Sequence, residues 1–327
     1  MQGLHPQCDE TRRTGSDGMS DVHDDPLALL QWAQACRESG HHAFLLLDTA
    51  QAEASHLKLQ SMHVPYASLF EGKREEALPE IAPLLLPLSG LDEQRALVLV
   101  RWVSQLGFAA PCLSWYESTL GLHDFAAHLR NFHHAGLSDG QAMMMRWYDT
   151  RILPIWMQAL TKDQLALFTG GMLSLAFVDR FGEARTLYQS EQVQPPSQAL
   201  PLDAPLVTLD DRQFGLLVDA GDLDALLTHL RFVIPDETNA LPPRTLVEFV
   251  AAYQQRAREA GVDDIDRQTQ YVLLALYTSG AGVEHPAVKA LMQNPPDSLA
   301  GYFDALQAMP EEVWEAGPPL WENEHVA

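Results

Sequence analysis

Three ionisable residues lie close together in the segment 143–153, and their types limit the chemistry that the segment could support. Arg146, Asp149 and Arg151 follow an apolar run that begins at Met143. Two guanidinium groups beside one carboxylate could form a buried ion-pair cluster, or they could form a binding site. Structural pairing is the better interpretation, because a strand-to-helix corner commonly uses Asp as a helix cap and Arg as its partner.

A second pattern with chemical potential is G-x-S-x-G at residues 136–140, with Ser138 at its centre. In hydrolases this pattern is a nucleophile elbow, which needs a strand before it and a helix after it. Here the order of the expected elements is reversed, with a helix before and a strand after. Ser138 is therefore expected on a turn, without a catalytic role.

The thirteen histidines include two adjacent pairs, His41-His42 and His133-His134. Neighbouring residues on a helix or strand point in different directions, so an adjacent pair rarely binds one metal ion. The sequence also lacks G-x-x-x-x-G-K-[ST] and G-x-G-x-x-G, the loops that hold nucleotide phosphates. We therefore predict no catalytic residues, no metal and no cofactor.

The composition predicts a soluble intracellular protein. The net charge is −23, and residues 201–327 carry −14 of it, from 21 acidic and 7 basic residues. Such a charge argues against nucleic acid and anionic membranes as partners. No apolar run approaches the roughly 20 residues that span a bilayer, so membrane insertion is not expected. The three cysteines have no C-x-x-C spacing, and no apolar segment follows Arg12-Arg13, so neither a disulfide framework nor a signal peptide is expected.

The elements that would position these residues alternate between strand and helix over residues 25–185. Strands are predicted at 43–47, 82–88, 112–117, 143–148 and 172–178. The run 143–148 is apolar except for Arg146 and does not alternate with polar residues, which is typical of a strand buried on both faces of a sheet. Pro83 and Pro87 cannot donate to a strand ladder, so 82–88 is expected at a sheet edge. The alternation predicts an α/β domain with a mainly parallel sheet and flanking helices.

Helix signals divide the rest of the chain. Asp92 and the capping box Thr161-x-x-Gln164 mark helix starts. Residues 1–24 are predicted to be a disordered tail, and the Pro- and Gln-rich residues 186–206 a linker. Beyond the linker only helical patterns occur, so 207–327 is predicted to be an acidic, all-α lobe.

Four segments in order resemble the type VI secretion adaptor/chaperone family. They are 42–48 (HAFLLLD), 66–72 (YASLFEG), 82–85 (APLL) and the run through Arg146-Trp147-Tyr148-Asp149-Thr150-Arg151. The resemblance covers about residues 42–170. It departs from the family pattern at 109–117, where Pro111 and Cys112 give a less regular strand, and no segment of the C-terminal part matches.

The resemblance implies a non-enzymatic adaptor in the cytoplasm of a Gram-negative bacterium. Such a protein would bind a toxic effector and help load it onto the secretion spike, a valine-glycine repeat protein. The acidic C-terminal lobe would contribute most to the choice of effector. The residues that carry the family motif, for structure or for partner binding, are Asp48, Tyr66, Leu69, Phe70, Gly72, Arg146, Tyr148, Asp149 and Arg151.

Two other functions stay open from the sequence. One is an enzyme of unknown reaction that uses an α/β cleft, with Asp48, Asp149 and Arg146 as the polar groups at strand ends. The other is a partner that neutralises a toxin, in which the acidic lobe masks a basic surface.

Overall fold

The computed structural model describes residues 26–196, 205–262 and 264–323. The predicted disordered tail 1–24 lies outside these residues, as does the part 197–204 of the predicted linker. The chain forms two compact units that meet in sequence between Leu217 and Val218, inside one long helix. Among the described residues, no helix combines the length and apolar content that crossing a membrane needs.

The first unit is built on a six-stranded sheet in the order β2-β3-β1-β4-β7-β8. These strands are β1 (His42–Asp48), β2 (Ala67–Ser68), β3 (Pro83–Pro87), β4 (Leu113–Ser118), β7 (Met172–Val178) and β8 (Ala184–Gln189). A separate three-stranded sheet, in the order β6-β5-β9, contains β5 (His134–Leu137), β6 (Ala142–Met144) and β9 (Val207–Leu209).

The prediction of a mainly parallel sheet is wrong, because every neighbouring pair in the six-stranded sheet is antiparallel. The helix α3 (Glu93–Ala109) does connect two strands of the same direction, β3 and β4. However, β1 lies between them and runs against both. The strand at 43–47 was therefore predicted, but its position between β3 and β4 was not.

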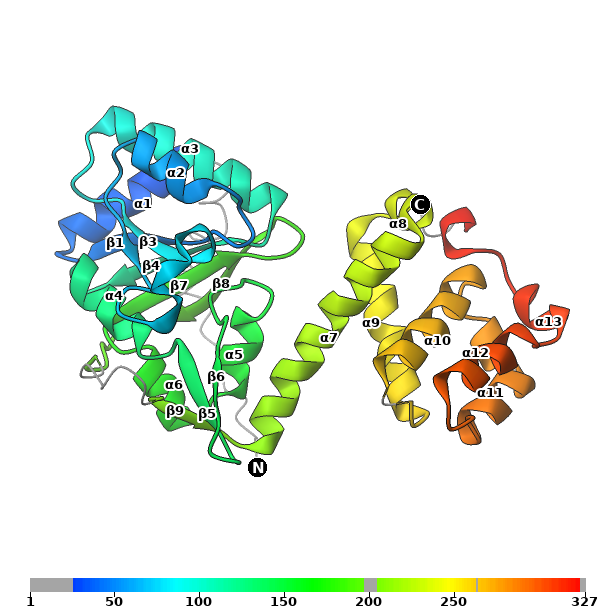
Figure 1. Cartoon of the computed structure of the whole chain (residues 1–327). Helices are drawn as coiled ribbons and strands as arrows, with labels where there is room; N and C mark the ends of the chain where they lie inside the picture. The colour runs from blue at the N-terminus through cyan, green and yellow to red at the C-terminus, as the bar shows by residue number, and fades with distance from the viewer. Residues whose placement is uncertain (1–25, 197–204, 263, 324–327) are drawn as a thin grey trace, which may run out of the picture. The chain divides into compact units, whose positions relative to one another are not determined.

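Helices cover this sheet and explain why its strands β1 and β7 are buried along almost their whole length. Figure 1 shows α1 (Pro26–Glu38) and α3 along one face, with α4 (Leu122–Arg130) toward the other. The remaining helices of the unit are α2 (Ser55–Ser61), η1 (Arg74–Ala77), η2 (Pro79–Ile81), α5 (Leu153–Ala159), α6 (Lys162–Phe168) and the start of α7 (Asp211–Val233). All seven residues of β7 are buried, as are six of the seven in β1. A strand covered on both faces buries every side chain, whichever direction its neighbours run.

Two further strand predictions are wrong. The edge position predicted for 82–88 is occupied by β2, so β3 is an internal strand. Its prolines are tolerated because they are its first and last residues, and β2 pairs only with Leu84 and Leu85. The buried strand predicted at 143–148 is also absent: β6 covers only residues 142–144, and Met144 is exposed. After β6 the chain enters a turn, in which Met145, Trp147 and Tyr148 are buried.

The predicted helix starts are confirmed where side chains cap them. The Asp92 carboxylate accepts a hydrogen bond from Arg95 N, and Thr161 and Gln164 form both bonds of a capping box. The Gln164 side chain also donates to Thr208 O, and Gln213 donates to Ala159 O and to Gln164. This amide network ties β9 and the start of α7 to α5 and α6, so residues 205–217 belong to the first unit.

The second unit is helical, as predicted. After α7 it contains α8 (Pro235–Ala240), α9 (Pro243–Glu259), α10 (Ile265–Tyr277), η3 (Gly282–Glu284), α11 (Pro286–Gln293), α12 (Leu299–Gln307), α13 (Glu311–Trp314) and η4 (Leu320–Glu322). Its core includes Tyr271, Val288 and Tyr302. A buried hydrogen bond from Gln254 to Gln268 joins α9 to α10.

Candidate functional site

The acidic and basic residues of the family-like motif form one cluster at the end of β1. Asp48, the last residue of β1, is 0% exposed, and Asp149 is 2% exposed. Arg146 Nη2 lies 3.0 Å from Asp48 Oδ2 and 3.6 Å from Asp149 Oδ2. Arg151 donates to both oxygens of Asp149, from Nε at 2.9 Å and from Nη2 at 2.6 Å. The structure thus brings together the four charged residues that the sequence analysis singled out.

Burial and pairing act on this cluster in opposite directions. Burial raises the pKa of Asp48, and the Arg146 guanidinium beside it opposes that rise. For Arg146, burial lowers the pKa, but Asp48 and Asp149 outweigh it and leave the pKa above the ordinary value. Burial also raises the pKa of Tyr148, which keeps its phenol protonated. Each buried charge of the cluster is compensated by an opposite charge, as expected for an ion-pair cluster with a structural role.

The second group of motif residues lies in the loop 66–72, on the other side of β3. Leu69 and Phe70 are buried, Tyr66 is half-buried, and Gly72 has a φ of +70°, a conformation that favours glycine. Leu69 N donates to Pro83 O, while Pro83 is the pairing partner of Asp48 in the β1–β3 ladder. Asp48 and Leu69 therefore lie on opposite sides of the same residue of β3, and the position of each group is set by that strand.

Arg130, which the sequence analysis did not select, fixes this loop. Its guanidinium donates to Ser68 O from Nε at 3.0 Å and from Nη2 at 2.8 Å, and it also pairs with Glu71. Next to the loop is a hollow of about 420 Å³ whose walls include Tyr66, His56 and His123. Arg130, the last residue of α4, thus ties that helix to the 66–72 loop.

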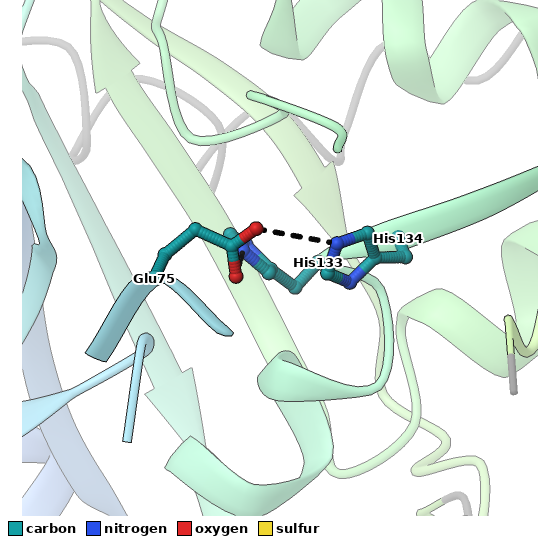
Figure 2. Close-up of side chains that lie close together, drawn as sticks. All are labelled: Glu75, His133 and His134. Carbon is teal, nitrogen blue, oxygen red and sulfur yellow. Dashed lines mark hydrogen bonds and ion pairs between the residues drawn. The ribbon is translucent and has the colours of Figure 1, made fainter. Parts of the chain in front are cut away.

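A third group consists of Glu75, His133 and His134 (Figure 2). Nε2 of His133 lies 3.1 Å from Oε2 of Glu75, and Nε2 of His134 lies 3.5 Å from Oε1. Burial lowers the pKa of His133 to about 4, although Glu75 opposes the shift. Burial also acts to raise the pKa of Glu75, but a backbone hydrogen bond and the two histidines bring it below its ordinary value. The Phe70 ring packs on His133 with 4.9 Å between centroids, which links this group to the loop 66–72.

Sequence reasoning missed Glu75 because 58 residues separate it from His133 and no spacing pattern joins them. The available signal was the His133-His134 pair directly after an amphipathic helix. Ser138, in contrast, lies where expected, on the turn between β5 and β6, and donates a hydrogen bond to Asp211. A helix does not follow it, so the elbow geometry of a hydrolase is absent there.

Comparison with known proteins gives one match. The family model described as "Domain of unknown function (DUF4123)" matches residues 43–167. This segment contains all three groups described above. Neither a curated protein nor a solved structure matches the chain.

Proposed function

We propose that this protein is a non-enzymatic adaptor of type VI secretion, which binds a toxic effector in the bacterial cytoplasm and helps to load it onto the spike protein. The observation that carries the proposal is the family match at residues 43–167. It falls on the segment in which four motifs resemble the type VI adaptor/chaperone family.

The arrangement of those motifs supports the proposal. Residues 42–48 form β1, residues 82–85 contribute to β3, which pairs with it, and the loop 66–72 bonds to β3 through Leu69. Arg146 then joins the fourth motif to β1. Segments that are distant in sequence thus meet as one substructure, which is expected if the resemblance reflects a shared fold rather than chance similarity in four short runs.

Binding is favoured over catalysis by the state of the buried carboxylates. A general base or nucleophile needs a carboxylate that can reach a substrate. Asp48 and Asp149 are buried, and each carboxylate is engaged by an arginine side chain. Our proposal therefore assigns this cluster to the architecture of the first unit.

We further propose that the second unit contributes most to effector choice. The residues of this unit, 218–327, include 18 acidic and 6 basic residues, and the resulting net charge of −12 would attract a basic surface. The unit also has a hollow of about 370 Å³ lined by Tyr277, Phe303 and Trp314. Aromatic side chains in such hollows are the usual anchors of protein–protein interfaces.

The test is binding of the purified protein to effector and spike proteins encoded next to its gene. Trp314→Ala should weaken effector binding by at least roughly tenfold if Trp314 is such an anchor. Leu167→Ala in α6 is a matched control, since both side chains are 39% exposed and apolar. Added salt should slow association far more than it speeds dissociation, because screening acts mainly on the approach.

Different outcomes would reject different parts of the proposal. If the association rate does not change with salt and Trp314→Ala binds the effector like the wild type, the second unit is not the effector-binding site. Failure of the full-length protein to bind either the effector or the spike would reject the adaptor role itself.

A further inference from the structure

We propose that Glu75, His133 and His134 form a zinc-binding site in the first unit. The three side chains come from two segments: Glu75 from η1, and the histidines from the junction between α4 and β5. Figure 2 shows both histidine side chains reaching toward the Glu75 carboxylate. The inference is independent of the adaptor role, because it rests on this geometry alone.

The spacing of the donor atoms fits a tetrahedral ion. Zinc bonds of about 2.0–2.1 Å to nitrogen and oxygen place neighbouring donors roughly 3.3–3.4 Å apart. His133 Nε2 lies 3.1 Å from Oε2 of Glu75, and His134 Nε2 lies 3.5 Å from Oε1, so each histidine is close to a different oxygen of the same carboxylate. One donor atom from each residue can be chosen so that all three lie within 4.8 Å of one another. The side chains of Glu75 and His134 are 18% and 20% exposed and therefore have room to rotate. Small rotations can bring donor atoms that are up to 4.8 Å apart to the spacing that a bound zinc ion requires.

Two adjacent histidines can meet here because the backbone changes course between them. His133 ends the turn after α4, whereas His134 is the first residue of β5 and pairs with Met144. Their rings stand almost perpendicular, at 85° and 4.7 Å between centroids. The objection that neighbouring side chains diverge holds within a helix or strand, and this pair lies at the boundary of one.

The donor set is one that zinc takes. Imidazole nitrogen is a ligand suited to Zn²⁺, and two histidines with one glutamate are a known catalytic zinc set that leaves a fourth position for water. The Nδ1 of His133 is buried and has no hydrogen-bond partner among the described residues, so packing on Phe70 orients the ring instead. A bound ion would tether η1 to the start of β5.

The test uses untagged, full-length protein that has been freed of metal with a chelator and then titrated with Zn²⁺ by calorimetry and with Co²⁺ by visible spectroscopy. We expect one equivalent of each ion and the strong visible bands of four-coordinate Co²⁺. Glu75→Gln and His134→Ala should each lower the affinity at least about tenfold, since even ligand-supporting residues contribute that much. His134→Ala keeps the bond between His133 and Glu75, so the variant should fold.

His229→Ala is the control, because it removes an exposed histidine of α7 far from the three ligands in sequence. It should bind like the wild type. A wild-type protein that takes up no metal would overturn the proposal. So would Glu75→Gln and His134→Ala variants that keep wild-type affinity, or a loss of binding in His229→Ala equal to theirs.

Discussion

Arg146 donates a hydrogen bond of 3.0 Å from Nη2 to Oδ2 of Asp48, a residue 98 positions earlier in the chain. The bond joins the turn before α5 to the last residue of a central strand. Asp48 is fully buried, whereas the Arg146 side chain is 38% exposed. The carboxylate therefore depends on the guanidinium much more than the guanidinium depends on the carboxylate.

Replacing Arg146 should destabilise the protein in a pH-dependent way. In Arg146→Met the buried Asp48 loses its positive partner, and we expect a loss of about 2–4 kcal/mol of unfolding free energy at neutral pH. Asp48 already has a pKa that burial raises, and the substitution raises it further. A group with a raised folded-state pKa contributes stability at low pH that is lost as the pH rises through that pKa. The deficit should therefore shrink as the pH is lowered.

Denaturant unfolding at neutral and acidic pH measures this effect. Arg101→Met, which removes an exposed arginine of α3, is the control for the loss of one positive charge and should change stability little. Adding Asp48→Asn to Arg146→Met should recover part of the loss at neutral pH. If Arg146→Met melts like the wild type at every pH, the joint contributes nothing to stability and the cluster should be reconsidered as a binding site.

The clustering of Arg146, Asp149 and Arg151 could be anticipated because all three lie within six residues. Asp48 could also be grouped with Arg146 and Asp149 as polar residues at strand ends, and the structure does bring them together. Glu75 could not be found in this way. Its contact with His133 depends on how η1 folds over the end of α4, and no local pattern records such a long-range contact.

For the fold, too, only the features that depend on neighbouring residues could be predicted from the sequence. Short stretches of sequence were enough to predict the helix caps at Asp92 and Thr161 and the buried runs of β1 and β7. They were not enough to predict strand direction, because a continuous apolar run fits any strand with helices on both faces. The placement of β1 between β3 and β4 is decided by packing of the whole unit, and so the parallel sheet was an error that local patterns could not correct.

His128 should make the protein less stable in weak acid. This buried histidine contacts Phe168 O from Nε2 at 3.0 Å, and burial lowers its pKa below the ordinary value of 6.5. A depressed folded-state pKa gives stability that is present above 6.5 and is lost as the pH falls below it. His128→Gln, which cannot gain a proton there, should show a smaller fall in melting temperature between neutral and weakly acidic pH.

The control for this measurement is His229→Ala, whose pH profile should match that of the wild type. Both are recorded with a chelator present, so that metal does not contribute. A His128→Gln profile as steep as the wild type's would show that this histidine is not the group that responds.

Where the chain is cut should decide whether the first unit folds alone. A fragment of residues 26–217 keeps β9, which pairs with β5, and Gln213, which bonds to Ala159 and Gln164. A fragment ending at residue 200 lacks both and exposes the apolar surface that Val207 and Leu209 cover. We expect the longer fragment to unfold cooperatively and the shorter one to unfold at lower denaturant concentration, or to aggregate.

A fragment of residues 26–167, which ends with the family match, extends the comparison. It lacks β7, the strand between β4 and β8, so it should not form the sheet. Circular dichroism in the near ultraviolet reports the packing of Trp115 and Trp156 in each fragment. Equal unfolding midpoints for the fragments ending at 200 and 217 would contradict the unit boundary.

The two cysteines of the described residues, Cys36 and Cys112, lie in the core of the first unit, where burial raises the pKa of each to about 12. Alkylating reagents react with the thiolate. In the folded protein both sulfurs are out of reach of the reagent, and their raised pKa also keeps them in the unreactive thiol form. In a Cys8→Ser variant, the rate at which such a reagent modifies the protein therefore measures how often the first unit unfolds locally and exposes Cys36 or Cys112. One thiol lies on α1 and the other immediately precedes β4, so the sites of modification would show whether the helix layer detaches before the sheet comes apart.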